Sequence, residues 1–188
     1  WDVASQKLFL VEDFLNTWSS KLSQLTETTD AALYITEKVQ HYKSVYPFLK
    51  YARGEDWCED HWISFFKMVG LPTNTNPTEL QLHDMLDVGD RLQSNMKALK
   101  ELAERARGEA TIRTSLEEIR SWFATTNFSW FNHTFNGRST FIVKEWKQLL
   151  SDLADKQSLI SSLKDSPFIK AFQDDAVIWD QKAIALAT

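Results

Sequence analysis

The sequence predicts a mainly α protein, an elongated helical bundle or arch with one small β-hairpin. Three observations lead to this prediction. Apolar residues recur every three or four positions through most of the 188 residues, which is the spacing of one face of a helix. One run, 84–123, keeps this spacing over a length of about 55–60 Å if it forms an unbroken helix. One stretch, 127–143, breaks the pattern with two β-rich runs around Asn136-Gly137, a strong hairpin signal.

The first part of the chain predicts two long amphipathic helices. The first covers 2–27, and its apolar stripe consists of Leu8, Val11, Leu15, Trp18, Leu22 and Leu25. The second covers 31–51, and Asp30 is a plausible N-cap for it. Pro47 lies inside the second helix, where we expect a kink or a restart because proline donates no N–H and its ring clashes with the preceding turn.

A shorter helix, 58–69, is predicted to end at Gly70 in the left-handed conformation. The long run that follows contains two glycines, Gly89 and Gly108, and each costs about 1 kcal/mol in a helix interior. We therefore expect any bend of the long helix at one of these two positions.

Two further helices are predicted after the hairpin. The first covers 144–163, and the second starts near Pro167 and continues to the end of the sequence. Trp146 and Trp179 lie on the apolar stripes of these helices, so we expect both to be buried and to pack near each other in an antiparallel pair. No stop signal precedes Thr188, which predicts that this helix is cut there.

The composition limits the classes of function. Hydrophobic residues make up 43% of the chain and include eight Trp and twelve Phe. The net charge of −5 argues against nucleic-acid binding, since phosphate contacts need clustered Lys and Arg. A single cysteine excludes an intrachain disulfide, and no apolar run approaches the roughly 18 residues of a membrane span. The chain has neither a secretory leader nor an initiator Met, from which we expect a fragment or a processed chain.

The sequence shows no catalytic constellation. It contains neither a G-x-x-x-x-G-K-[ST] phosphate loop nor G-x-G-x-x-G. Cys58 and His61 have a spacing found in metal sites, but a structural zinc site needs four ligands and no second pair accompanies them. The plainer interpretation is a small buried thiol and an imidazole on a helix surface. We therefore expect no catalytic, cofactor-binding or metal-ligating residue in this chain.

The hairpin is the strongest candidate for an interaction site. Its first strand alternates so that Phe128 and Trp130 lie on one face and Phe131 and His133 lie on the other. A two-stranded hairpin can bury only one face against the helices, so the second aromatic face needs another cover. We take Trp130, Phe131 and Phe135 as candidate docking residues.

Several motifs resemble dynein heavy chains. "SLKDSPFIKAFQDDAVIW", 162–179, is similar to a pattern near the end of the first half of the dynein linker. "GEATIRTSLEEIRSW", 108–122, and "IVKEWKQLL", 142–150, resemble the segments that precede it. The structural family motif is carried by Trp122, Trp146, Pro167, Phe168, Phe172 and Trp179.

Two more segments resemble the cytoplasmic dynein 2 subfamily, the motor of retrograde intraflagellar transport. They are "YKSVYPFLKYARGEDWCEDHWISFFKMVGLP", 42–72, and "LFLVEDFLNTW", 8–18. The chain departs from that subfamily at Phe168-Ile169, where two tyrosines are expected and axonemal dyneins often carry Phe-Ile. The hairpin, 124–140, also has more aromatic residues than the usual dynein 2 segment.

The resemblance implies that 1–188 is a single fragment of the linker, with helical subdomains of about 1–72 and 78–188. The linker swings over the AAA+ ring of the same heavy chain and produces the power stroke of minus-end-directed microtubule transport. The fragment would be no enzyme and hold no cofactor, while the full heavy chain would be a microtubule-stimulated ATPase with ATP and Mg in the AAA+ ring.

The implied partners are the AAA+ ring, and the microtubule and the cargo through the rest of the motor, with no nucleic acid and no membrane span. The implied location is the cytoplasm, the cytoskeleton and the cilium. Trp130, Phe131 and Phe135 would dock on the AAA+ ring. Two alternatives stay open: an axonemal dynein linker, and a spectrin-like or tethering helical module without a motor role. The hairpin and the irregular helix lengths speak against a repeat of fixed period.

Overall fold

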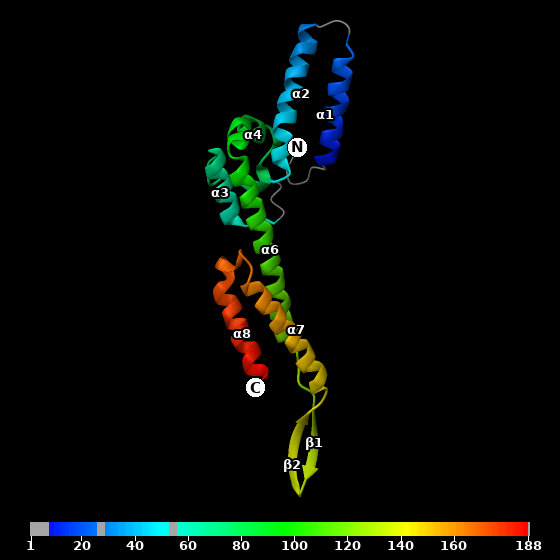
Figure 1. Cartoon of the computed structure of the whole chain (residues 1–188), viewed down its shortest axis with the longest axis vertical. Coiled ribbons are helices and arrows are strands. Elements are labelled where there is room, and N and C mark those ends of the chain that lie inside the picture. The colour runs from blue at the N-terminus through cyan, green and yellow to red at the C-terminus, as the bar shows by residue number, and fades with distance from the viewer. Residues whose placement is uncertain (1–7, 26–28, 53–55, 188) are drawn as a thin grey trace. The chain divides into compact units, whose positions relative to one another are not determined.

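The computed structural model describes residues 8–25, 29–52 and 56–187, and in this part of the chain it shows helices and one two-stranded antiparallel sheet (Figure 1). The predicted class, a mainly α fold with one small hairpin, is confirmed. The chain divides into two compact units, Trp1–Arg107 and Gly108–Thr188. The division lies inside one helix, α6 (Met96–Thr125), whereas the sequence predicts subdomains of about 1–72 and 78–188.

The first unit has one large apolar core and a smaller apolar cluster between its first two helices. Its elements are α1 (Leu8–Ser23), α2 (Asp30–Leu49), α3 (Glu59–Val69), the short 3-10 helix η1 (Pro77–Glu79), α4 (Leu82–Asp87), α5 (Gly89–Ser94) and the first turns of α6. Phe65 and Phe66 of α3 are buried in the large core together with Met85, Leu92 and Leu99, which come from α4, α5 and α6. Residues 78–107 therefore share a core with the helices before them, which is why the division falls near residue 107.

The helix pair α1 and α2 is held by a small apolar cluster and one polar contact. Leu15 packs with Val39 and Tyr46, and the Tyr46 hydroxyl donates to Glu12 Oε2 at 2.7 Å. Burial, together with the hydrogen bond to Glu12 and the charge of its carboxylate, raises the pKa of Tyr46 from 10.0 to about 12. A tyrosine with a raised pKa stabilises the fold fully below its unfolded pKa, and this contribution is lost as the pH rises through about 12.

Three local predictions concern the helices of the first unit: the start of α2, a kink or restart at Pro47, and the end of α3. The N-cap of α2 is Thr29, one residue before the predicted Asp30, and its Oγ1 accepts the N–H of Ala32 at 3.2 Å. The helix continues through Pro47 to Leu49, so no restart occurs there. The predicted end of α3 is confirmed, since Gly70 has φ 74°.

The long helix predicted over 84–123 is wrong as a single element, because it is divided into α4, α5 and α6. The first break is at Val88, next to Gly89, which lies so close to α2 that an added Cβ would be 2.8 Å from Val45 Cγ2. The second break is at Asn95, whose side-chain amide donates to the carbonyl of Arg91 at 2.9 Å. Such a side chain competes with the backbone for hydrogen bonds and favours a helix end.

The second unit contains the rest of α6, β1 (Trp130–Phe135), β2 (Arg138–Val143), α7 (Trp146–Lys164), the 3-10 helix η2 (Ile169–Phe172) and α8 (Gln173–Ala187). Its core is formed by aliphatic residues of α6, α7 and α8, among them Ile119, Leu153 and Ile160. Half-buried aromatic residues pack against this core, namely Trp122, Phe123, Phe168, Phe172 and Trp179. An ion pair between Lys164 and Asp180 and a hydrogen bond from Gln157 to the Ala183 carbonyl show that α7 and α8 are antiparallel, as predicted.

Gly108 lies in the interior of α6 and does not break it. A Cβ at this position would lie 2.1 Å from Cδ2 of Phe168. The presence of glycine at position 108 is therefore explained by the close approach of the Phe168 ring to the helix backbone. A bend is not needed to explain it.

The environment of Trp146 differs from the one predicted for it. It is 52% exposed at the first residue of α7, so the expectation that it is buried near Trp179 is wrong. The antiparallel pairing of Lys164 with Asp180 places Trp146 opposite a position beyond Ala187, where α8 ends. The last helix also begins later than predicted, at Gln173, because residues 169–172 form η2 first.

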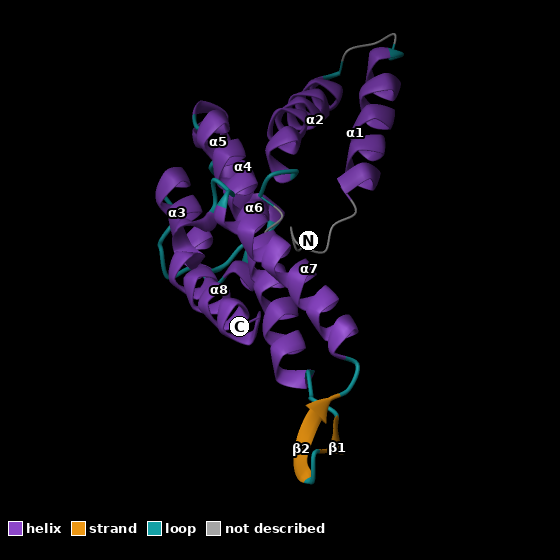
Figure 2. Ribbon diagram, turned by 60° about the horizontal axis from the view of Figure 1, so that its bottom comes forward, coloured by secondary structure: helices purple, strands orange, loops and turns teal. Residues whose placement is uncertain are grey.

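The hairpin is found where the sequence predicts it. Asn136 and Gly137 both have positive φ, 51° and 72°, which is the type I′ turn that matches the twist of two antiparallel strands. The register pairs Trp130 with Val143 and Phe135 with Arg138. The two strands project beyond the adjoining ends of α6 and α7 (Figures 1 and 2).

Candidate docking surface

Both faces of the hairpin are exposed to solvent. Every residue of β1 and β2 is exposed except Val143, which is half-buried. The expectation that one face is buried against the helices is therefore wrong. The cause is the position of the strands, which extend past the adjoining helix ends and so have no second layer to pack on.

The first face combines aromatic side chains with positive charge. We call it the cationic face, and the register assigns to it Phe131, His133, Phe135, Arg138, Thr140 and Ile142. Phe131 is 40% exposed and Phe135 is 66% exposed. Lys144 follows on the same side of the ladder, and its Nζ lies 5.8 Å from the centroid of the Phe131 ring. Cations over aromatic rings attract the ring face, so this geometry keeps Lys144 beside the exposed ring.

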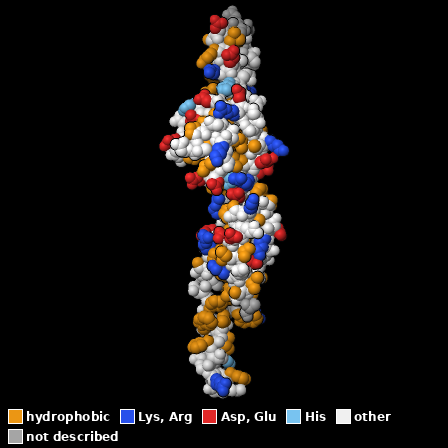
Figure 3. Space-filling model, turned by 90° about the vertical axis from the view of Figure 1, so that its left-hand side faces the viewer, with side chains coloured by type: hydrophobic (Ala, Val, Ile, Leu, Met, Phe, Trp, Pro, Cys, Tyr) orange, Lys and Arg blue, Asp and Glu red, His pale blue; other side chains and the backbone are white. Residues whose placement is uncertain are grey.

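The second face carries aromatic side chains without charge. We call it the neutral face, and it consists of Trp130, Asn132, Thr134, Ser139, Phe141 and Val143. Trp130 is 57% exposed and Phe141 is 75% exposed. The Trp130 ring lies 5.6 Å from the ring of Phe128, which precedes the strand. In the view of Figure 3, hydrophobic, basic and histidine side chains are visible over the hairpin at the bottom, and no acidic side chain is.

The base of the hairpin is fixed to the start of α7 by the backbone. The Lys144 N–H donates to the Ser129 carbonyl at 2.6 Å, which extends the ladder by one pair. The next residue, Glu145, has φ 56° and caps α7 from the left-handed region. This conformation is strained for a residue with a Cβ. The direction in which the hairpin leaves the helices is therefore set partly by one strained residue.

The structural motif residues fall into two groups. Trp122, Phe168, Phe172 and Trp179 pack on the core of the second unit. Pro167 lies exposed in the turn before η2, and Trp146 is exposed. The three candidate docking residues, Trp130, Phe131 and Phe135, are all exposed, but they do not share a face: Trp130 lies on the neutral face and the other two on the cationic face.

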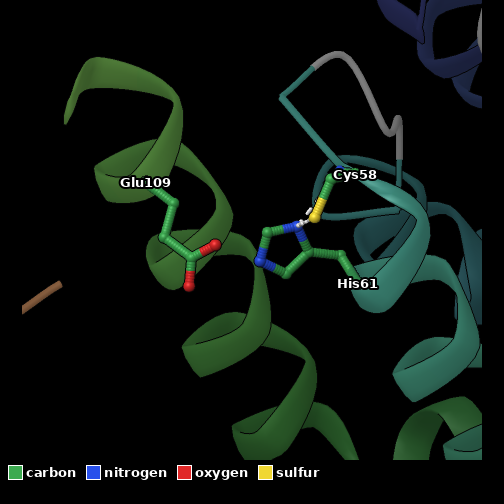
Figure 4. A group of neighbouring side chains, drawn as sticks. All are labelled: Cys58, His61 and Glu109. Carbon is green, nitrogen blue, oxygen red and sulfur yellow. Dashed lines mark hydrogen bonds between the residues drawn. The ribbon is translucent and has the colours of Figure 1, made fainter. Parts of the chain in front are cut away.

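Cys58 and His61 form a local contact at the start of α3 (Figure 4). The Cys58 N–H donates to His61 Nδ1 at 3.1 Å, and the Cys58 sulfur lies 3.1 Å from the same nitrogen. The plainer interpretation of this pair is wrong in both parts, since His61 is fully buried and Cys58 is half-exposed. These two side chains cap the start of α3.

An apolar groove on the first unit was not predicted from the sequence. It has a volume of about 620 Å³ and is lined mainly by Leu10, Phe14, Tyr34, Ile35, Leu82 and Leu86, from α1, α2 and α4. Leu10 and Phe14 lie beside the predicted stripe of α1 rather than on it, and this second row of apolar residues was the available signal.

Among the helices of residues 8–25, 29–52 and 56–187, none is both long enough and apolar enough to cross a bilayer.

Comparison with known proteins gives a consistent result over the whole chain. Residues 1–187 match the family described as "Dynein heavy chain, N-terminal region 2". The chain is 35% identical over 187 residues to "Cytoplasmic dynein 2 heavy chain 1" of Mus musculus and to the protein of the same name of Homo sapiens, and 35% identical over 184 residues to that of Caenorhabditis elegans. These alignments cover 99%, 99% and 97% of this chain and 4% of each relative. The chain thus spans a small part of the length of the curated relatives it matches.

Proposed function

This chain belongs to the dynein heavy chain family, and from that premise we propose that it is a fragment of the dynein linker, the mechanical element that swings over the AAA+ ring and produces the power stroke. The observation that carries the proposal is the hairpin. It projects from the helices and exposes aromatic side chains on both faces, which is typical of a surface that binds a partner.

The two helical units suit a force-transmitting element. Each has its own buried core. A mechanical element also needs contacts that form in one nucleotide state and break in another, because a ligand shifts an equilibrium only through contacts that differ between states. The exposed hairpin residues Trp130, Phe131 and Phe135 are the proposed switchable contacts with the AAA+ ring.

The relatives named cytoplasmic dynein 2 support a more specific proposal. The full motor would move cargo toward the microtubule minus end in retrograde intraflagellar transport, in the cytoplasm and the cilium. It would be a microtubule-stimulated ATPase with ATP and Mg bound in its AAA+ ring, outside this chain. The absence of a phosphate loop from residues 1–188 is compatible with that division of roles.

The proposal is tested by removing the aromatic side chains of the hairpin. We expect a combined change of Trp130, Phe131 and Phe135 to Ser to keep the melting temperature of the isolated chain within a few degrees, because all three side chains are exposed. The same change in the full heavy chain should slow microtubule gliding while nucleotide binding by the AAA+ ring is unchanged. Normal gliding would exclude a mechanical role, and collapse of the isolated fold would show that these residues belong to a core.

A tethering helical module is the second candidate, and the apolar groove on α1, α2 and α4 favours it, because an amphipathic helix binds in such grooves. The two candidates differ in where the functional contact lies. Changing Phe14, which is exposed in the groove, to Ser should leave gliding unaffected if the hairpin is the mechanical contact. Normal gliding after both Phe14→Ser and the hairpin changes would favour the tethering role, which has no part in movement.

A further inference from the structure

The charge of the hairpin differs from that of the rest of the chain. Residues 127–144 contain Arg138 and Lys144 and no Asp or Glu, whereas the whole chain has a net charge of −5. Both cations lie on the same side of the hairpin, the side that carries Phe131 and Phe135. The neutral face contains no charged residue at all.

The two cations have no acidic partner within the described residues. Neither Arg138 nor Lys144 takes part in an ion pair there, although other basic residues of the same unit do, such as Lys156 with Glu118. The Lys144 side chain is instead directed over the exposed Phe131 ring. Any partner that covers these aromatic side chains will therefore also cover two unpaired cations.

Burying an unpaired cation is unfavourable, so the partner must supply negative charge where it meets this face. Aromatic residues with a nearby Arg are also the residue types most often found at the centre of protein interfaces. Resting on the proposed function, in which the hairpin docks on the AAA+ ring, we propose that the cationic face is the docking face and that it binds an apolar protein surface of the AAA+ ring bearing at least two carboxylates. Of the three candidate docking residues, Phe131 and Phe135 then take part in this contact, and Trp130, on the neutral face, does not. One carboxylate meets Arg138 near the turn, and the other meets Lys144 near the base of the hairpin.

Lys144 allows this contact to be tested directly in the purified full heavy chain. A water-soluble carbodiimide activates a carboxylate, and a neighbouring amine then forms an amide with it and releases the activating group as a urea, so only amines in direct contact with a carboxylate are joined. We expect Lys144 to be joined to an Asp or Glu of the AAA+ ring in at least one nucleotide state. Lys147, which lies on α7 and not on the hairpin, is the internal control and should not be joined there.

The turn offers a matched pair of neighbouring positions on opposite faces. Arg138→Lys places an amine on the cationic face opposite Phe135, and Ser139→Lys places one on the neutral face opposite Thr134. Both positions are exposed, so neither change should disturb the fold. We expect a cross-link to the AAA+ ring from Arg138→Lys and none from Ser139→Lys.

The outcomes separate this inference from the function on which it rests. If the serine changes of the hairpin slow gliding but Lys144 and Arg138→Lys give no cross-link to the AAA+ ring, the hairpin docks by another face and the carboxylate proposal is overturned. Equal cross-links from Arg138→Lys and Ser139→Lys would overturn it as well. When microtubules are added to the purified heavy chain, a cross-link that joins Lys144 to tubulin instead of to the AAA+ ring would assign the face to the microtubule and reject the proposed partner.

Discussion

The second unit contains two groups of aromatic residues with opposite environments. Five aromatic residues of α6, η2 and α8 and of the segment joining α7 to η2 pack on an aliphatic core, namely Trp122, Phe123, Phe168, Phe172 and Trp179. Five aromatic residues in and next to the hairpin are exposed, namely Phe128, Trp130, Phe131, Phe135 and Phe141. The two groups have similar composition, so residue type alone does not decide which of them is structural.

The difference comes from the element that carries each group. A helix of the second unit buries one face against two other helices, so aromatic residues on that face are covered by the same chain. A two-stranded hairpin has two faces and no second layer, and here it projects past the helices. An isolated hairpin of this kind is marginally stable in water, so exposed aromatic residues on it are better explained by a partner than by the fold.

The largest expected effect comes from truncating one aromatic residue of each group and comparing the losses of stability. Trp179→Ala should lower the free energy of unfolding by about 2–4 kcal/mol, because Trp179 packs on the core and its ring lies 5.2 Å from that of Phe123. Trp130→Ser should change it by no more than about 0.5 kcal/mol. Urea unfolding of both variants measures the contrast, and similar losses from the two changes would remove it.

A smaller effect is expected from the glycine that lies against the aromatic core. Gly108→Ala should destabilise the chain by about 1–2 kcal/mol, since overpacking against the Phe168 ring exceeds the gain in helix propensity. The sign should reverse when Phe168 is first changed to Ala, because the same added methyl then meets no ring. Thermal unfolding of the four proteins in this cycle checks the prediction, and a cost that is unchanged without Phe168 would contradict it.

Gly137 is the matched glycine of the hairpin. Glycine is favoured there by the backbone conformation and not by a close contact with another residue. It has φ 72°, and no atom lies within 4 Å of the position that an added Cβ would take. Gly137→Ala should therefore cost only the strain of the left-handed conformation, about 1 kcal/mol in urea unfolding. No second-site change of an aromatic residue should rescue it.

The smallest expected effect is at the junction between the two regions. Glu145→Gly should raise the free energy of unfolding by up to about 1 kcal/mol, because glycine adopts φ 56° without the penalty of a Cβ. Glu145→Ala keeps a Cβ and should show no such gain. Equal stability of the two variants in urea would show that the junction is not strained in solution.

The sequence predicts the local features of this fold better than the long-range ones. The Asn136-Gly137 turn and the Gly70 cap depend on backbone preferences of a few neighbouring residues, and both are confirmed. The break at Val88 lies next to Gly89, one of the two positions where a bend was expected. The break at Asn95 depends on a side-chain hydrogen bond, which periodicity does not report.

The candidate docking surface was also predictable only in part, because its strand pattern is local and its exposure depends on tertiary structure. Strand alternation placed aromatic residues on both faces, which the register confirms. Whether either face was covered depended on how far the strands extend past α6 and α7, and that is a tertiary property. The exposure of Trp146 was missed because it depends on where the neighbouring helix α8 ends.

The central claim is that the hairpin is covered by the rest of the heavy chain in a way that depends on nucleotide. Hydrogen–deuterium exchange of residues 128–144, measured in the isolated chain and in the full heavy chain with and without ATP, tests it most directly. We predict rapid exchange of the hairpin in the isolated chain, since its strands are exposed, and slower exchange in the full heavy chain in one nucleotide state. Equal exchange of these residues in the isolated chain and in every nucleotide state of the full heavy chain would contradict the account.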